Sequence, residues 1–397
     1  MTDAPLEGIT VLDLGQIYNG PYCGYLLAMA GARVIKVEPP TGEGMRGRRG
    51  GDGLLSYPFM MLNGNKETVT LNLKDERGRD LLKRLVQHAD VLLENFSPGT
   101  MERNGVGSAT LLEINPRLIY GAATGFGRGG PHRDYRAMDI TVQAMTGVVA
   151  ITGNDDEPPL KSGPALCDIL GGAHLYAAIT TALVRRARTG KGAVLDVAMQ
   201  DAVFPTLTSA LGAYYAVGGN PPRTGNHHQA MAVAPYNVYA AADGHVAIIC
   251  IREGHWQSLS RAMGRPELTE DPRFESMKER ARNMAATDEA VEAWTSTLPK
   301  AEVFRICQEH DVICAPVQSL DDVLNDPHLL ERGALAKLAH EHFGDVTLPS
   351  TALRFEDVEP PPVTLPRPLG ADNESVYGGL LGLDRAQLEE LAGAGAI

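Results

Sequence analysis

Basic residues are scarce in this sequence relative to acidic ones. The 397 residues contain 36 Lys and Arg against 49 Asp and Glu, which gives a formal net charge of −13 at pH 7. This balance disfavours binding to nucleic acid or to an anionic membrane surface through overall charge. It leaves room for a local basic pocket that holds an anionic small molecule. We therefore expect neither nucleic acid nor a membrane as a partner.

Long apolar runs and paired cysteine motifs are also missing. No apolar run reaches the roughly 18 residues of a membrane helix, and the first residues, MTDAPLEG, lack the basic and apolar regions of a signal peptide. The five cysteines are an odd number and form no C-x-x-C motif, which indicates a reduced, cytoplasmic protein without structural zinc. The pairs His227, His228 and His340, His342 are too sparse for a metal site, so we expect no bound metal.

Strand-like and helix-like stretches alternate over the first half of the chain. Residues 75–89 carry apolar side chains at helical i, i+3, i+4 spacing, and residues 20–32 also read as a helix. Strands are predicted at 8–15, 33–40, 67–74, 90–96 and 117–126. Such alternation is typical of an α/β domain with a mainly parallel sheet.

The composition and the predicted secondary-structure pattern of the sequence change after residue 218. Residues 218–229, GGNPPRTGNHHQ, form a link rich in Gly, Pro and Asn. Two strand-like runs then meet at Asp243-Gly244, which is a hairpin signal, and helical patterns follow at 256–263 and 288–298. We predict a large α/β domain in residues 1–218 and a smaller α+β domain in residues 219–322.

Residues 125–130, GFGRGG, match the dinucleotide-binding pattern G-x-G-x-x-G. In that motif the glycines open a helix, because the pyrophosphate lies on the helix N-terminus. Here Pro131 and polar residues follow, so we interpret the stretch as a glycine-rich loop.

A carboxylate, Asp168, stands where a long helix is predicted to begin. Asp is a favoured N-cap and suits the positive end of the helix dipole, and on spacing alone we favour that role. The same position also suits a carboxylate nucleophile, since Gly163, Gly171 and Gly172 would let a substrate approach the backbone. Cys167 is a weaker candidate, because the sequence places no His or cation beside it.

Several motifs follow one another along essentially the whole chain. They include GQIYNGPYC (15–23), ADVLLENFSPG (89–99), SGPALCDILGG (162–172) and RTGKGAVLDVAMQDAV (188–203). The series resembles the class III coenzyme A transferases, the family of formyl-CoA transferase. The resemblance implies a large Rossmann-like domain to which residues 323–397 return, a smaller domain between, and an interlocked homodimer.

The resemblance also implies a mechanism and a set of site residues. Asp168 would attack the thioester carbonyl of an acyl-CoA to give an acyl-aspartyl anhydride, and CoA would pass to a carboxylic acid acceptor through an aspartyl-CoA thioester. CoA and acyl-CoA are then substrates, and no cofactor is permanently bound. The implied CoA contacts are Ile17, Tyr18, Asn95, Phe96, Arg103, Arg136 and Met138.

The sequence departs from formyl-CoA transferase at three places. Gln and Arg of that enzyme are replaced by Tyr18 and Pro39, and its glycine loop over the active site is not recognisable. These differences disfavour formate and oxalate as the substrates. The segment expected in place of that loop is Gly225, Asn226, His227, His228 and Gln229.

Two other functions remain open at this point. An α-methylacyl-CoA racemase, an isomerase of the same fold, carries a His-Asp pair where this chain has Met138 and Asp139, and it needs both an acid and a base. A catalytically silent CoA-binding protein is the other alternative, and the presence of Asp168 disfavours it.

Overall fold

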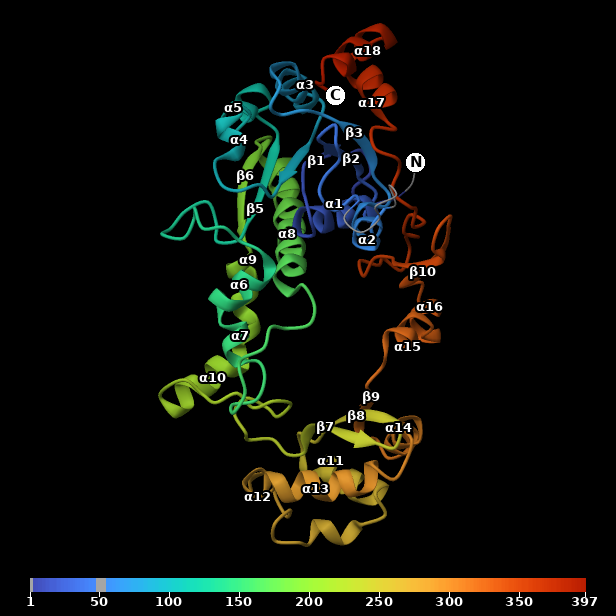
Figure 1. Cartoon of the computed structure of the whole chain (residues 1–397). Helices are drawn as coiled ribbons and strands as arrows, with labels where there is room; N and C mark the ends of the chain where they lie inside the picture. Colours follow the sequence, from blue (N-terminus) through green and yellow to red (C-terminus); the bar gives the residue numbers. More distant parts are fainter. Residues whose placement is uncertain (1–2, 48–54) are drawn as a thin grey trace. The chain divides into compact units, whose positions relative to one another are not determined.

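The computed structural model describes residues 3–47 and 55–397, and the chain folds into two compact units (Figure 1). The large unit comprises the described residues of 1–146 together with 163–204 and 325–397, and the small unit comprises 147–162 and 205–324. The chain therefore passes from the large unit to the small one twice. The domain boundaries predicted after residues 218 and 322 stay a proposal.

The large unit is built on a six-stranded sheet in which every neighbouring pair is parallel. The strands are β1 (Thr10–Asp13), β2 (Arg33–Glu38), β3 (Glu67–Thr70), β4 (Val91–Glu94), β5 (Ile119–Thr124) and β6 (Ala193–Ala198). Their order is β3-β2-β1-β4-β5-β6. The predicted parallel sheet is confirmed. The order reverses direction between β1 and β4, and open α/β sheets bind ligands at such a point.

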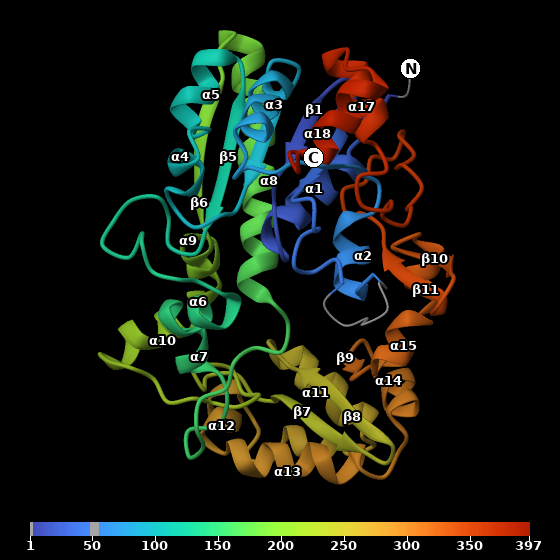
Figure 2. The same cartoon turned by 45° about the horizontal axis from the view of Figure 1, so that its top comes forward.

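Helices of the large unit cover both faces of this sheet (Figure 2). The large unit as a whole contains α1 (Asn19–Met29), α2 (Tyr57–Asn63), α3 (Glu76–Val86), α4 (Thr100–Arg103), α5 (Ser108–Ile114), α6 (Asp139–Thr146), α8 (Leu166–Thr189), α9 (Met199–Val203), α16 (Pro327–Glu331), α17 (Asn373–Leu381) and α18 (Arg385–Gly393). Successive strand residues point to opposite faces. Val11 thus packs in the core with α1 and α8, whereas Leu12 packs in the core with α3, α5, α17 and α18.

Helix α8 is the longest helix of the described chain and lies along β5 and β6 (Figure 2). By length and composition alone it would also be able to cross a membrane, a candidate that the absence of a long uninterrupted apolar run did not reveal. In the structure Leu175 and Ile179 of α8 are fully buried against the sheet. One face of α8 therefore belongs to the core of the large unit, while other residues of the helix, such as Val184, are exposed. The glycine motif at 125–130 is a loop, as predicted, and the next helix, α6, begins only at Asp139.

The C-terminal segment seals the outer edge of the sheet at β3. The Asp372 carboxylate accepts the Thr68 N–H at 2.8 Å, and the Asn373 side-chain oxygen accepts the Thr70 N–H at 2.9 Å. The Tyr377 hydroxyl donates to the Thr70 carbonyl at 2.7 Å. Earlier in the same segment, β10 (Leu335–His340) and β11 (Gly344–Pro349) form an antiparallel hairpin. Residues 325–397 are thus part of the large unit.

The small unit has an antiparallel sheet in the order β7-β8-β9. Its elements are α7 (Val148–Ile151), α10 (Thr208–Val217), β7 (Tyr236–Ala241), β8 (Gly244–Ile249), α11 (Glu253–Ala262), η2 (Pro266–Thr269), α12 (Met277–Arg282), α13 (Met284–Thr295), α14 (Lys300–Glu309), β9 (Ile313–Pro316) and α15 (Leu320–Leu324), with η1 (Phe204–Leu207) joining α9 to α10. The predicted hairpin is confirmed, since Ala241 pairs with Gly244 across its turn. Trp256, Leu259 and Val291 belong to a separate core, so the unit is α+β as expected.

Candidate active site

A cavity of about 290 Å³ opens at the point where the strand order of the large unit reverses. Its walls come from the segments that follow parallel strands: Gln16 and Ile17 after β1, Asn95 and Phe96 after β4, and Thr124 at the end of β5. Asn19, Ser97, Thr100, Ala123, Gly125, Ala137, Met138, Asp168 and Met199 complete the lining. A second cavity of this unit, about 360 Å³, has no carboxylate among its lining residues.

Asp168 is not the cap of its helix. Helix α8 begins at Leu166, so Asp168 is its third residue, and the N-cap residue Ala165 provides no side-chain hydrogen bond. The acceptor at this helix end is Asp139 from α6, whose Oδ2 accepts the N–H groups of Cys167 at 2.8 Å and of Asp168 at 3.1 Å. The cap interpretation that spacing alone favoured is therefore wrong, because a residue distant in sequence does that work.

Asp168 is buried, with 8% of the residue exposed, and its carboxyl group has a raised pKa. Burial is the main cause and the neighbouring Asp139 the second, and together they raise the pKa of Asp168 to about 7. A poorly solvated carboxylate that is ionised near neutral pH is suited to nucleophilic attack. The adjacent Cys167 is fully buried, and burial with both carboxylates raises the pKa of its thiol to about 12. Because this thiol stays protonated, Cys167 is a poorer candidate for the nucleophile than Asp168.

The loop between β1 and α1 forms one wall of the cavity and is held rigidly. Asn95 Oδ1 accepts the Gln16 N–H at 2.7 Å, and its Nδ2 donates to the Gln16 carbonyl at 2.9 Å. Ile17 has a φ of 65°, a strained value for a β-branched residue, and its N–H donates to Glu43 at 3.3 Å. The Asn95 side chain therefore positions this wall, a role that the sequence did not reveal.

Buried charged residues also hold the loop between β1 and α1 in place. Lys66 Nζ donates to Asp13 Oδ2 at 2.7 Å and to Asn63 Oδ1 at 3.0 Å, and burial lowers the pKa of Lys66 to about 8. Asp13 Oδ1 in turn accepts the Gly15 N–H at 2.8 Å, while Lys36 donates to the Gly15 carbonyl. Sequence reasoning missed this cluster, because its charges lie inside apolar strands or in loops.

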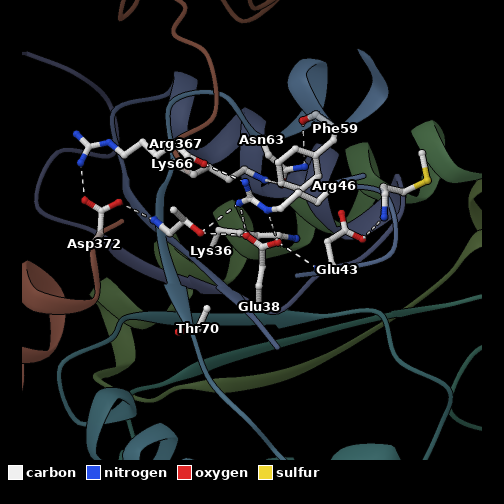
Figure 3. Close-up of polar contacts among 12 residues, drawn as sticks. Lys36, Glu38, Glu43, Arg46, Phe59, Asn63, Lys66, Thr70, Arg367 and Asp372 are labelled. Atoms are coloured by element: carbon white, nitrogen blue, oxygen red, sulfur yellow. Dashed lines mark hydrogen bonds and ion pairs between the residues drawn. The ribbon is translucent and has the colours of Figure 1, made fainter. Parts of the chain in front are cut away.

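A second charge cluster lies next to the first (Figure 3). The Arg46 guanidinium donates to both oxygens of the Glu38 carboxylate and lies over the Phe59 ring, 4.4 Å from its centroid. The Glu38 carboxylate also accepts the Glu43 N–H at 3.2 Å. Glu43 is the residue that holds Ile17, so this cluster also supports the cavity wall.

The structure brings some of the predicted CoA contacts together with Asp168. Ile17, Asn95, Phe96 and Met138 all line its cavity.

The other predicted contacts do not line the cavity. Tyr18 is the N-cap residue of α1, and Arg136 is exposed. Arg103 is also exposed, but its Nη2 donates at 3.0 Å to the hydroxyl of Thr100, which does line the cavity. Arg103 therefore lies at the cavity rim, and the contact roles of all seven residues stay predictions.

The predicted active-site cover, residues 225–229, belongs to the small unit. His227 Nε2 is 2.7 Å from Asp288 Oδ2, and Tyr239 donates to the other oxygen of Asp288, also at 2.7 Å. Gln229 Nε2 donates to the Thr224 hydroxyl at 3.2 Å. The loop is thus anchored within its own unit, and its role as a cover stays a prediction. Among the described residues, no group of three His, Cys, Asp or Glu side chains is arranged to hold a metal.

The sequence and structure match known proteins over nearly their whole length. The family model for CoA-transferase family III covers residues 6–373. The chain is 36% identical over 417 aligned positions to the formyl-CoA:oxalate CoA-transferase of Streptomyces coelicolor, with 100% of both chains covered. It is 38% identical to the acetyl-CoA:oxalate CoA-transferase of Acetobacter aceti, with 90% of each covered. A CAIB/BAIF family protein from Brucella suis superposes with a TM-score of 0.85 at 34% identity, covering 95% of this chain and 99% of that one.

These matches define the class of protein. The chain belongs to CoA-transferase family III and is an enzyme of the class III CoA-transferase type. The resemblance noted in the sequence and the expected α/β architecture are both confirmed. Its substrates include a CoA thioester.

Proposed function

We propose that the enzyme moves coenzyme A from an acyl-CoA thioester to a carboxylic acid acceptor, with Asp168 as the nucleophile. The observation that carries this proposal is the position of Asp168. It is a buried carboxyl group with a pKa of about 7, in a cavity at the reversal point of a parallel sheet.

In the first half of the proposed reaction, Asp168 takes the acyl group. A carboxylate oxygen attacks the thioester carbonyl carbon, the C–S bond breaks, and CoA leaves as the thiolate. The product is an acyl-aspartyl anhydride. The thiolate then attacks Cγ of Asp168, the bond from Cγ to the bridging oxygen breaks, and the original acid leaves. Asp168 is now an aspartyl-CoA thioester, and no high-energy bond has been spent.

The second half repeats these steps with the acceptor. The acceptor carboxylate attacks Cγ of Asp168 and displaces the thiolate to form a second anhydride. The thiolate attacks the acceptor's acyl carbon, which gives the new acyl-CoA and returns Asp168 as a carboxylate. An anhydride is reactive enough to pass its acyl group onward without ATP.

We place CoA against the wall formed by Ile17, Asn95, Phe96 and Met138, with its phosphates toward Arg103 at the rim. A guanidinium binds phosphate oxygens well. The size of the cavity and the curated relatives favour small carboxylic acids as donor and acceptor. We further propose that the enzyme acts in the cytoplasm as a homodimer, consistent with its five free, buried cysteines.

The test is to trap the covalent intermediate. Incubation with an acyl-CoA, followed by hydroxylamine or borohydride, should modify the peptide that carries Asp168, and mass spectrometry reads the adduct. Asp168→Asn should lose turnover yet still bind CoA, because the amide cannot form the anhydride. An adduct on Cys167, or near-normal turnover of the variant, would refute the proposal. A panel of acyl-CoA donors against carboxylate acceptors then identifies the substrates.

A further inference from the structure

Asn19 has an unusual environment for an asparagine. It is the first residue of α1, is 1% exposed and lines the cavity of Asp168. Neither its Nδ2 nor its Oδ1 has a hydrogen-bond partner among the described residues. Burying an amide in this way costs about 1 to 3 kcal/mol, so a role in function is the natural explanation. In the same unit, Asn63 is buried and Asn95 is half-buried, yet the side chains of both are hydrogen-bonded.

The position of the Asn19 amide relative to Asp168 follows from Gly171. A Cβ atom at Gly171 would lie only 2.2 Å from Asn19 Nδ2. Gly171 is three residues after Asp168 on α8, and residues at this spacing share a helix face with Cβ atoms about 5 to 6 Å apart. The Asn19 amide therefore lies against the Asp168 face of α8. At Gly172 a Cβ would lie 2.5 Å from the backbone carbonyl oxygen of Asn19, so both glycines are needed for α1 to come this close to α8.

The charge that develops on Asp168 needs a hydrogen-bond donor. The N–H groups of Cys167 and Asp168, at the start of α8, already donate to Asp139. Asn19 Nδ2 is a buried donor on the same helix face that has no partner among the described residues. Donors fixed in a water-poor site stabilise a developing oxyanion strongly, because they need no reorganisation when the charge forms.

We propose that Asn19 is a catalytic residue that stabilises the oxyanion formed on the side chain of Asp168. When the thiolate attacks Cγ, the S–Cγ bond forms and the carbonyl π pair moves onto the Oδ atom that is not bonded to the acyl group. Asn19 Nδ2 donates to that oxygen. The pair then returns, and the bond from Cγ to the leaving carboxylate breaks. This proposal rests on the function proposed above and adds the donor for its second and third steps.

Asn19→Leu tests the proposal because leucine has nearly the same shape without the donor. We expect kcat to fall about 100- to 1,000-fold, with an unchanged Kd for CoA and an unchanged or higher Tm, since an unsatisfied amide is replaced. The first step does not place charge on the Asp168 oxygen. The variant should therefore release one equivalent of CoA thiol in a burst and accumulate the acyl-aspartyl adduct. Asn63→Leu is the matched stability control, and it should lower Tm by removing bonds to Lys66 and Phe59.

A second variant tests the geometry independently. Gly171→Ala should displace the Asn19 amide and lower kcat in the wild-type background. In an Asn19→Ala background the same change should cost much less, because only the flexible Met199 side chain, with Cγ 3.0 Å from the new Cβ, then has to move, so the two effects should be non-additive.

Three results would overturn the assignment of Asn19. The first is a wild-type kcat for Asn19→Leu, and the second is an effect of Asn19→Leu on CoA affinity alone. The third is additivity of the effects of Gly171→Ala and Asn19→Ala on kcat. Asp168→Asn is measured in parallel to separate the two proposals. If it is inactive while Asn19→Leu is fully active, only Asn19 has been assigned wrongly; if Asp168→Asn turns over, the proposed function fails and the role of Asn19 fails with it.

Discussion

Replacing Asp168 by Asn should stabilise the protein at neutral and alkaline pH. The ordinary pKa of Asp is 3.8, and burial with the nearby Asp139 raises that of Asp168 to about 7 in the folded chain. Between these values the folded state keeps a proton that the unfolded state has lost, so stability falls as pH rises. At 1.36 kcal/mol per pH unit the loss reaches about 4 kcal/mol above pH 7. Asparagine does not ionise and avoids this loss.

Thermal unfolding of the wild type and Asp168→Asn between pH 4 and pH 8 measures this effect. The two Tm values should nearly coincide at pH 4, where the wild-type side chain is largely protonated in the folded state, and should diverge progressively up to pH 8. The measurement at pH 4 is the internal control, since any effect of the substitution on packing appears there as well. A variant that loses stability relative to the wild type between pH 4 and pH 8 would refute the reasoning. Constant separation of the curves would show that Asp168 has an ordinary pKa.

Four further predictions address other parts of the molecule. Asp139→Asn should move the acidic limb of the kcat/KM profile to lower pH, because it removes the charge that helps to raise the pKa of Asp168; an unmoved limb would contradict this. Lys66→Met should cost about 3 to 5 kcal/mol of unfolding free energy by leaving Asp13 buried without its partner, and a smaller loss in chemical denaturation would show that water reaches Asp13. A 2-methylacyl-CoA in heavy water should take up deuterium at its α-carbon no faster than transfer occurs, whereas rapid uptake would favour a racemase. Sedimentation at nanomolar concentration should still find a homodimer, and a compact active monomer would count against the interlocked assembly.

The sequence predicted the strands β1 to β5 of the parallel sheet, because each of them carries a local signal. The β-branched and leucine-rich runs around β1, β2, β4 and β5 are short, apolar and bounded by polar or Gly and Pro residues. Short helices such as α4 and α9 gave no comparable signal, since only a few residues define them. The sealing of β3 by Asp372 was also hidden, because about 300 residues separate the partners.

The sequence pointed to Asp168 and to four of the residues that line its cavity, but not to the contacts that hold them in place. Asp168 was recognised from its motif, yet spacing alone favoured a helix cap. The true acceptor, Asp139, lies on another helix and no local pattern points to it. Asn19 was not identified either, because what points to it is the lack of a hydrogen-bond partner among the described residues rather than its type or spacing. Contacts between distant segments decide both cases.

The sealing of β3 has a consequence for synthesis of the chain on the ribosome. The strand contains residues 67–70, whereas the side chains that satisfy its edge come from residues 372–377. For most of translation this strand therefore exposes unpaired N–H and carbonyl groups, which are a template for pairing with other chains. A chain that terminates before residue 372 keeps the open edge permanently, so such truncations should aggregate rather than yield a smaller soluble protein.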